Sequence, residues 1–158
     1  MERSEDQILA EELAALGAVS GGSGGLVRVV AKLLRKDVHE IDLVAPLPFD
    51  AVVKRVSHVL GSAGRAVETA SAGTGEEETI RVVVGGGAGG LNPVVVTARV
   101  LKAAEDSTEI WLRAAAKEGL IRQRAGEKTA VRLAALLGEE VGWWAETGTA
   151  RRRDADGP

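Results

Sequence analysis

The run of small residues from Gly85 to Gly90 is the first feature of this sequence that could do chemistry. Gly85, Gly87 and Gly90 satisfy G-x-G-x-x-G, a spacing found where a strand turns into a helix whose N-terminus holds a dinucleotide pyrophosphate. The chain that follows, LNPVVVT, contains an Asn-Pro turn signal and β-branched residues, which favour a strand. We therefore expect residues 85–93 to join two sequential strands. They form either a long mobile connection or a loop that edges a pocket.

His39, Glu40 and Asp42 are neighbouring side chains of the types that bind metal ions. In a strand, His39 points to the face opposite Glu40 and Asp42, so the three cannot converge on one ion. A zinc site needs three or four protein ligands, whereas this chain has two histidines and no cysteine. No serine lies in a nucleophile-elbow context. We expect no metal site, no cofactor and no catalytic residue.

Two further groups of side chains could contact a partner. Trp143 and Trp144 stand together in a chain whose other aromatic residues are Phe49 and Trp111. They either cap the core beside the last helix or form an exposed anchor for a protein partner. A basic stretch near the last helix is either a solvated face or a contact for an anion or an acidic partner. It comprises Lys117, Arg122, Arg124, Lys128 and Arg132.

Composition excludes several classes of protein. The 158 residues suit one domain with tails, and a formal net charge of −3 gives no general attraction to nucleic acid. Aromatic residues make up only 3%, which argues against a binder of single-stranded nucleic acid. The acidic N-terminus lacks the apolar region of a signal peptide, and no apolar run is long enough to span a bilayer. We expect a cytoplasmic protein with no membrane span.

Hydrophobic periodicity predicts the elements that must position these residues. Residues 4–17 read as a helix, which Ser4 and Gln7 can start with a capping box. The linker GGSGG and an apolar segment at 26–36 follow, the latter interpreted as helix. The remaining predicted elements are a strand at 38–44, a helix at 50–64, strands at 65–71, 79–84, 93–101 and 107–115, and a helix at 120–138 that Gly138 ends.

The predicted organisation is an N-terminal helical extension with a Gly-rich linker (1–36), a single α+β domain (37–145) and a disordered tail (146–158). The order β-α-β-β-β-β-α favours an antiparallel sheet with the C-terminal helix packed across one face. The predicted core includes Val52, Val56, Val59, Leu133 and Leu137, whereas His58 lies on the solvent side of its helix.

The segments VHEIDLVAPLPFDAVVKRVSHVLGSAG and TEIWLRAAAKEGLIRQRAGEKTAVRLAALLG carry a resemblance to the helix-grip fold of the START and polyketide-cyclase-like superfamily. The resemblance covers residues 37–138. It implies a first strand that ends in a Pro-containing turn into a helix. It also implies a long last helix across a curved antiparallel sheet, over a cavity. This chain has five predicted strands, fewer than the superfamily usually has, and no catalytic residue carries over.

These patterns favour a domain without catalysis of its own that binds an apolar small molecule or lipid between the sheet and the last helix. Ala-rich helix faces and few aromatic residues would leave room there. The competing hypothesis is a protein-interaction module that docks through Trp143 and Trp144 or a sheet edge, and an enzyme ranks third. The predicted ligand-binding residues are Val96, Ala98, Ile110, Leu112, Ala130, Ala134 and Leu137.

Overall fold

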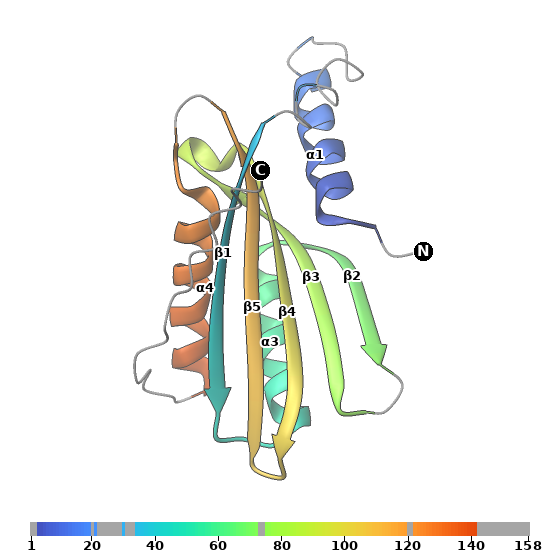
Figure 1. Ribbon diagram of the computed structural model, residues 1–158, viewed down its shortest axis with the longest axis vertical. Helices are drawn as coiled ribbons and strands as arrows, with labels where there is room; N and C mark the ends of the chain where they lie inside the picture. The colour runs from blue at the N-terminus through green and yellow to red at the C-terminus, as the bar shows by residue number, and fades with distance from the viewer. Residues whose placement is uncertain are drawn as a thin grey trace, which may run out of the picture.

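A computed structural model describes residues 3–19, 21, 30, 34–72, 75–119 and 122–141 (Figure 1). After the N-terminal helix, the strands and helices follow the predicted order β-α-β-β-β-β-α, and the α+β class is confirmed. The elements are α1 (Glu5–Val19), β1 (Arg35–Ala45), α3 (Phe49–Ala63), β2 (Arg65–Ala72), β3 (Glu77–Gly86), the 3₁₀ turn η1 (Ala88–Gly90), β4 (Asn92–Ala104), β5 (Ser107–Glu118) and α4 (Ala125–Val141).

The five strands form one sheet in the order β1-β5-β4-β3-β2, and every neighbouring pair is antiparallel. Strands β2 to β5 are a meander because short turns connect them, with Glu105 and Asp106 at the tip of the predicted β4–β5 hairpin. Helix α3 carries the chain from β1 at one edge of the sheet to β2 at the other. β1 pairs with the last strand, so Arg35 lies opposite Glu118.

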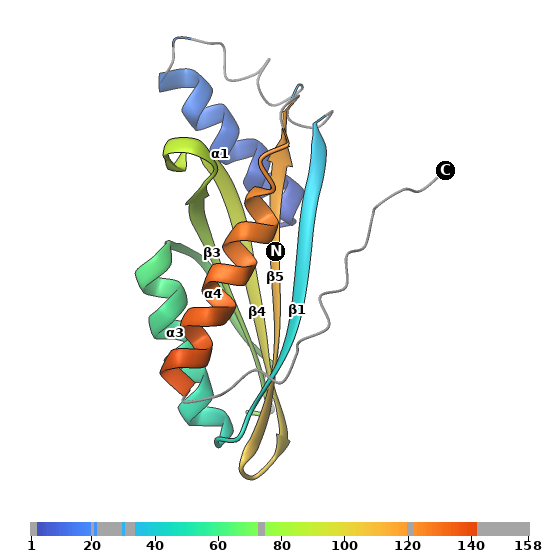
Figure 2. The same cartoon turned by 90° about the vertical axis from the view of Figure 1, so that its left-hand side faces the viewer.

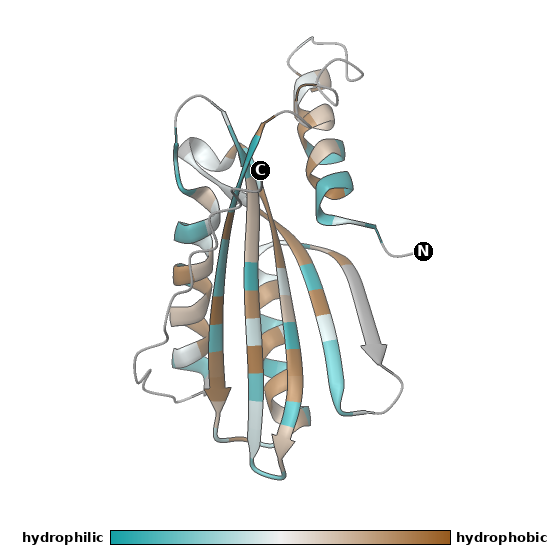
Figure 3. Cartoon of the chain, viewed as in Figure 1, coloured by the Kyte–Doolittle hydropathy of each residue, from teal (hydrophilic) through white to brown (hydrophobic). Residues whose placement is uncertain are grey.

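Side chains alternate between the two faces of the sheet, as a strand pattern of period two requires. In β5, Thr108, Ile110 and Leu112 are buried, whereas Glu109 is exposed on the other face. Figure 3 shows this alternation as bands of teal and brown along the strands. The predicted pattern in β1 is also confirmed, because His39 and Leu43 are buried on one side and Asp42 is exposed on the other.

Helices α3 and α4 cover the same face of the sheet (Figure 2), and the main core lies between these layers. All five predicted core residues are buried there. This arrangement, with the last helix packed across one face of an antiparallel sheet, is helix-grip-like. The core also takes Leu43, Phe49, Leu60, Ile80, Val82, Val84, Val94, Val96, Ala98, Val100, Ile110, Leu112, Ala114, Ala116, Ala125 and Ala130.

The limits predicted for α4 were wrong at both ends. The helix starts at Ala125, because Arg124 takes a left-handed conformation (φ 52°) that an α-helix does not contain. It continues through Gly138 to Val141. A glycine inside a helix costs only about 1 kcal/mol relative to alanine, which the burial of Leu133 and Leu137 easily offsets.

Helix α1 lies on the opposite face of the sheet, near the end that carries η1 (Figures 1 and 2). The predicted capping box is confirmed: Gln7 N donates to Ser4 Oγ at 3.2 Å, and Ser4 N donates to Gln7 Oε1 at 2.9 Å. Ile8 and Leu9 of α1 form a second apolar cluster with Val95 and Ala115 of the sheet. The sheet is therefore covered on both faces at this end.

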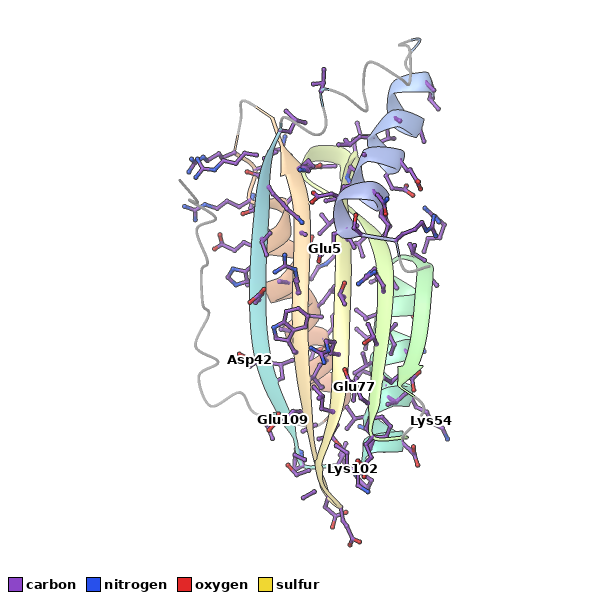
Figure 4. The ribbon with its side chains drawn as sticks, turned by 45° about the vertical axis from the view of Figure 1, so that its right-hand side comes forward. Glu5, Asp42, Lys54, Glu77, Lys102 and Glu109 are labelled. Atoms are coloured by element: carbon purple, nitrogen blue, oxygen red, sulfur yellow. The ribbon has the colours of Figure 1, made fainter. Side chains whose placement is uncertain are left out.

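Ion pairs hold the first turn of α1 onto the strands. The Arg113 guanidinium donates to Glu5 Oε1 at 2.8 Å, and Lys36 Nζ lies 3.0 Å from the same carboxylate (Figure 4). Lys117 Nζ lies 3.1 Å from Asp6 Oδ1. Burial alone would raise the pKa of Glu5, but the contacts with Arg113 and Lys36 outweigh it and hold that pKa below its usual value.

Several predicted features lie outside the described residues. They are most of the GGSGG linker and of the segment 26–36, both tryptophans of the pair Trp143 and Trp144, and the tail 146–158. Within the described part of the chain, no helix is long and apolar enough to cross a membrane.

Candidate functional site

The glycine run forms a tight turn between β3 and β4. The two strands remain paired up to Gly86 opposite Asn92, and the single 3₁₀ turn η1 joins them. The expectation that residues 85–93 join sequential strands is confirmed, and no crossover helix starts at Gly90. The connection is nevertheless much shorter than the long mobile loop that we considered, because both strands extend into the glycine run.

Two of these glycines are required by close packing. A Cβ at position 85 would lie 2.6 Å from the carbonyl oxygen of Gly90, so the turn could not fold back on itself. Gly87 has a φ of +69°, which side chains rarely adopt, and a Cβ there would overlap the side chain of Gln123. The segment that leads into α4 thus packs directly on the turn.

The start of α4 is capped by carboxylates from two distant strands. Glu118 of β5 accepts a hydrogen bond from Ala125 N at 3.0 Å, and Asp37 of β1 accepts bonds from Gly126 N at 3.0 Å and from Glu127 N at 3.4 Å. These contacts satisfy the free N–H groups of the first turn and complement the helix dipole. They fix the end of α4 that lies beside the glycine turn.

The seven predicted ligand-binding residues lie on two surfaces that face each other. Four of them come from β4 and β5, and the other three come from α4. All except Ala134 are at most 2% exposed, and Ala134 packs against the same core from a partly buried position. We call this set (Val96, Ala98, Ile110, Leu112, Ala130, Ala134 and Leu137) the sheet–α4 layer.

An open hollow of about 640 Å³ lies between α3 and α4 and is called here the α3–α4 groove. Its floor is partly apolar, with Val59, Ala63 and Leu136, and Arg55 of α3 donates to the carbonyl oxygen of Glu140 beside it. Sequence reasoning missed this groove, because Leu136 and the neighbouring polar residues look like an ordinary solvated helix face. The lining residues are His58, Val59, Ser62, Ala63, Arg132, Leu136, Glu139 and Glu140.

A second open hollow of about 610 Å³ lies between the glycine turn and the first turns of α4, and is called here the cationic hollow. Arg132 lines both hollows, so they are adjacent along one flank of α4. Figure 2 shows η1 beside the first turns of α4 and α3 beside its later turns. The lining residues are Gly85, Gly86, Gly87, Arg122, Gln123, Ala125, Lys128, Thr129 and Arg132.

His39, Glu40 and Asp42 do not form a cluster. His39 is buried on the face that carries α3 and α4, whereas Glu40 pairs with Arg113 on the other face. Within the described ranges, His39 Nε2 is buried without a hydrogen-bond partner, and no group of three His, Asp or Glu side chains could hold a metal ion.

No family model matches this chain, and no curated protein matches it. Among solved structures it is similar to Ara h 8.0201, with 12% identity over 68% of this chain and 97% of that one, at a TM-score of 0.39. A conserved protein from Geobacillus kaustophilus has 10% identity over 66% and 91% of the two chains, with a TM-score of 0.41. The Zhui aromatase/cyclase from a Streptomyces species has 16% identity over 67% and 94%, with a TM-score of 0.35. These scores assign no function.

Proposed function

We propose that this chain binds one apolar small molecule or lipid between the sheet and α4, and that the molecule is admitted through the α3–α4 groove. The observation that supports this best is the composition of the groove floor. Val59 belongs to the main core cluster, and Ala63 packs against it. An apolar ligand in the groove therefore meets the core without crossing a polar layer.

The side chains of the sheet–α4 layer suit this role because they are aliphatic and small. Ala98 on the sheet and Ala130 and Ala134 on α4 present methyl groups, so an outward movement of α4 would expose aliphatic surface alone in this layer. Burial of apolar ligand surface contributes about 25 cal/mol per Å², which would offset the packing lost between the layers. A ligand with a long apolar part recovers most of that loss.

The rim of the groove suggests that the ligand also has a polar end. Arg132, Glu139 and Glu140 are exposed around the apolar floor, together with His58 from α3. Binding sites for small molecules commonly combine an apolar body with a few polar groups that fix orientation. An amphipathic molecule fits this pattern better than a plain hydrocarbon.

A competition experiment tests the proposal. The native protein is titrated with the fluorescent dye ANS, and a long-chain fatty acid is then added as competitor. We expect saturable binding at one site per chain and displacement by the fatty acid. Leu136→Glu, which places a charge on the groove floor, should weaken binding about tenfold, the equivalent of about 1.4 kcal/mol.

Val131→Glu is the matched control, because Val131 lies on the same helix, is 53% exposed and does not line the groove. It should bind like the unmodified chain. Ala134→Phe fills the sheet–α4 layer and should also reduce binding while urea unfolding shows a folded protein. Absence of saturable binding, or equal binding by Leu136→Glu and Val131→Glu, would refute the proposal.

A further inference from the structure

The cationic hollow gathers three positive side chains. Arg122 precedes α4, and Lys128 and Arg132 lie one turn apart on the helix, where residues four positions apart are neighbours. All three are exposed, and none of the residues that line the hollow is acidic. A net charge of −3 for the whole chain makes this local excess of positive charge a specific feature of the site.

These three cations have no ion-pair partner among the described residues, unlike many other basic side chains. Arg113, Lys36 and Lys117 pair with α1, and Arg99 pairs with Glu77. Even Arg124, next to the hollow, lies 3.7 Å from Glu127. Like charges that share a hollow repel each other, so an anion bound between them would relieve this repulsion.

The start of α4 does not itself provide the site, because Glu118 and Asp37 already accept hydrogen bonds from its first N–H groups. The positive side chains and the glycine turn have to provide it. Gly85, Gly86 and Gly87 form a wall without side chains, and Thr129, which is 5% exposed, contributes to the lining. A small oxyanion can therefore approach closely.

We propose that the cationic hollow binds an oxyanion, a carboxylate or a phosphate group. Resting on the proposed function, we assign this oxyanion as the acidic head group of the ligand whose apolar part occupies the α3–α4 groove. Arg132 carries the connection, because it lines both hollows. The ligand class is thus an amphipathic acid that lies along one flank of α4.

The test uses three probes on the full-length protein: inorganic phosphate, a medium-chain fatty acid and the fatty alcohol of the same chain length. Affinities and amide chemical shifts are measured by NMR. We expect the acid to bind at least about tenfold more tightly than the alcohol, since hydrogen bonds to charged groups are the strong ones. Added salt should reduce this difference. Amide shifts at residues 85–87 and 128–129 should accompany binding of the acid.

Lys128→Gln and Arg122→Gln should each weaken binding of the acid about tenfold and leave binding of the alcohol unchanged, because neither residue lines the groove. Lys54→Gln is the control for net charge, since Lys54 is exposed on α3 and lines neither hollow (Figure 4). It should bind both probes normally. If phosphate shifts the same amides and displaces the acid, both groups share the site. If only the acid acts, the site prefers a carboxylate.

The outcomes separate the two proposals. Shifts with phosphate, without binding of either amphiphile, would support the anion site and refute the groove as an apolar site. Equal affinities for acid and alcohol, unchanged in Lys128→Gln and Arg122→Gln, would retain the groove and overturn the anion site. Absence of any response to all three probes would overturn both.

Discussion

Individual glycines have different roles in this chain, and their surroundings decide which. Gly61 lies inside α3, and a Cβ there would meet no atom within 4 Å. Gly126 lies in the first turn of α4, where a Cβ would lie 2.9 Å from the carbonyl oxygen of Asp37 and 3.2 Å from that of Ala114. Gly126 therefore lets the start of α4 approach β1 and β5 closely enough for Asp37 to cap it.

Alanine at these two helical positions should have opposite effects. Gly61→Ala should stabilise the protein by about 0.5 to 1 kcal/mol, because alanine loses less conformational entropy in a helix. Gly126→Ala should destabilise it by about 1 to 3 kcal/mol, the usual cost of overpacking, because backbone atoms of two strands would have to move. Urea unfolding of both variants measures the difference. Stabilisation by Gly126→Ala would contradict the close packing described for the start of α4.

At the level of elements, local patterns in the sequence predicted much of the fold. The alternation in β1 and β5, the apolar stripe of α3 and the capping box at Ser4 each depend on residues a few positions apart. The start of α4 could not be predicted in this way, because its caps come from Asp37 and Glu118 and not from the preceding residues. The position of α1 on the outer face was missed for the same reason, since its partners are spread over several strands.

The docking of α1 should depend on pH. The pKa of Glu5 is lowered in the folded state, as is that of Asp6, so their contribution to stability is complete above the unfolded pKa of about 4.3. It is lost as the pH falls through the lower folded value. We expect hydrogen exchange of the α1 amides to stay slow from neutral pH to about pH 5 and to accelerate below about pH 4, after correction for intrinsic rates.

Two variants test this assignment. Glu5→Gln should weaken protection of α1 at neutral pH and reduce its acid dependence. Glu11→Gln should not, because Glu11 is half exposed and reaches only Arg3, at 3.4 Å. Identical exchange in the two variants would show that the contacts of Glu5 with Arg113 and Lys36 do not hold the helix.

At the scale of the whole molecule, the two faces of the sheet have different partners. Helix α1 covers one face through ion pairs and a small apolar cluster, whereas α3 and α4 enclose the main core on the other. The predicted sheet–α4 layer was located correctly from strand and helix periodicity. The two hollows were not predicted, because they depend on how α3 and the glycine turn lie against one flank of α4, which no local pattern encodes.

The central claim is that one amphipathic molecule binds beneath and beside α4. Native mass spectrometry of the full-length protein with a long-chain fatty acid tests it most directly, since the mass gives both occupancy and stoichiometry. We predict a complex with one fatty acid per chain, retained in Val131→Glu and strongly reduced in Leu136→Glu. A spectrum that contains only the free chain at saturating fatty acid, or the same occupancy in both variants, would contradict the account.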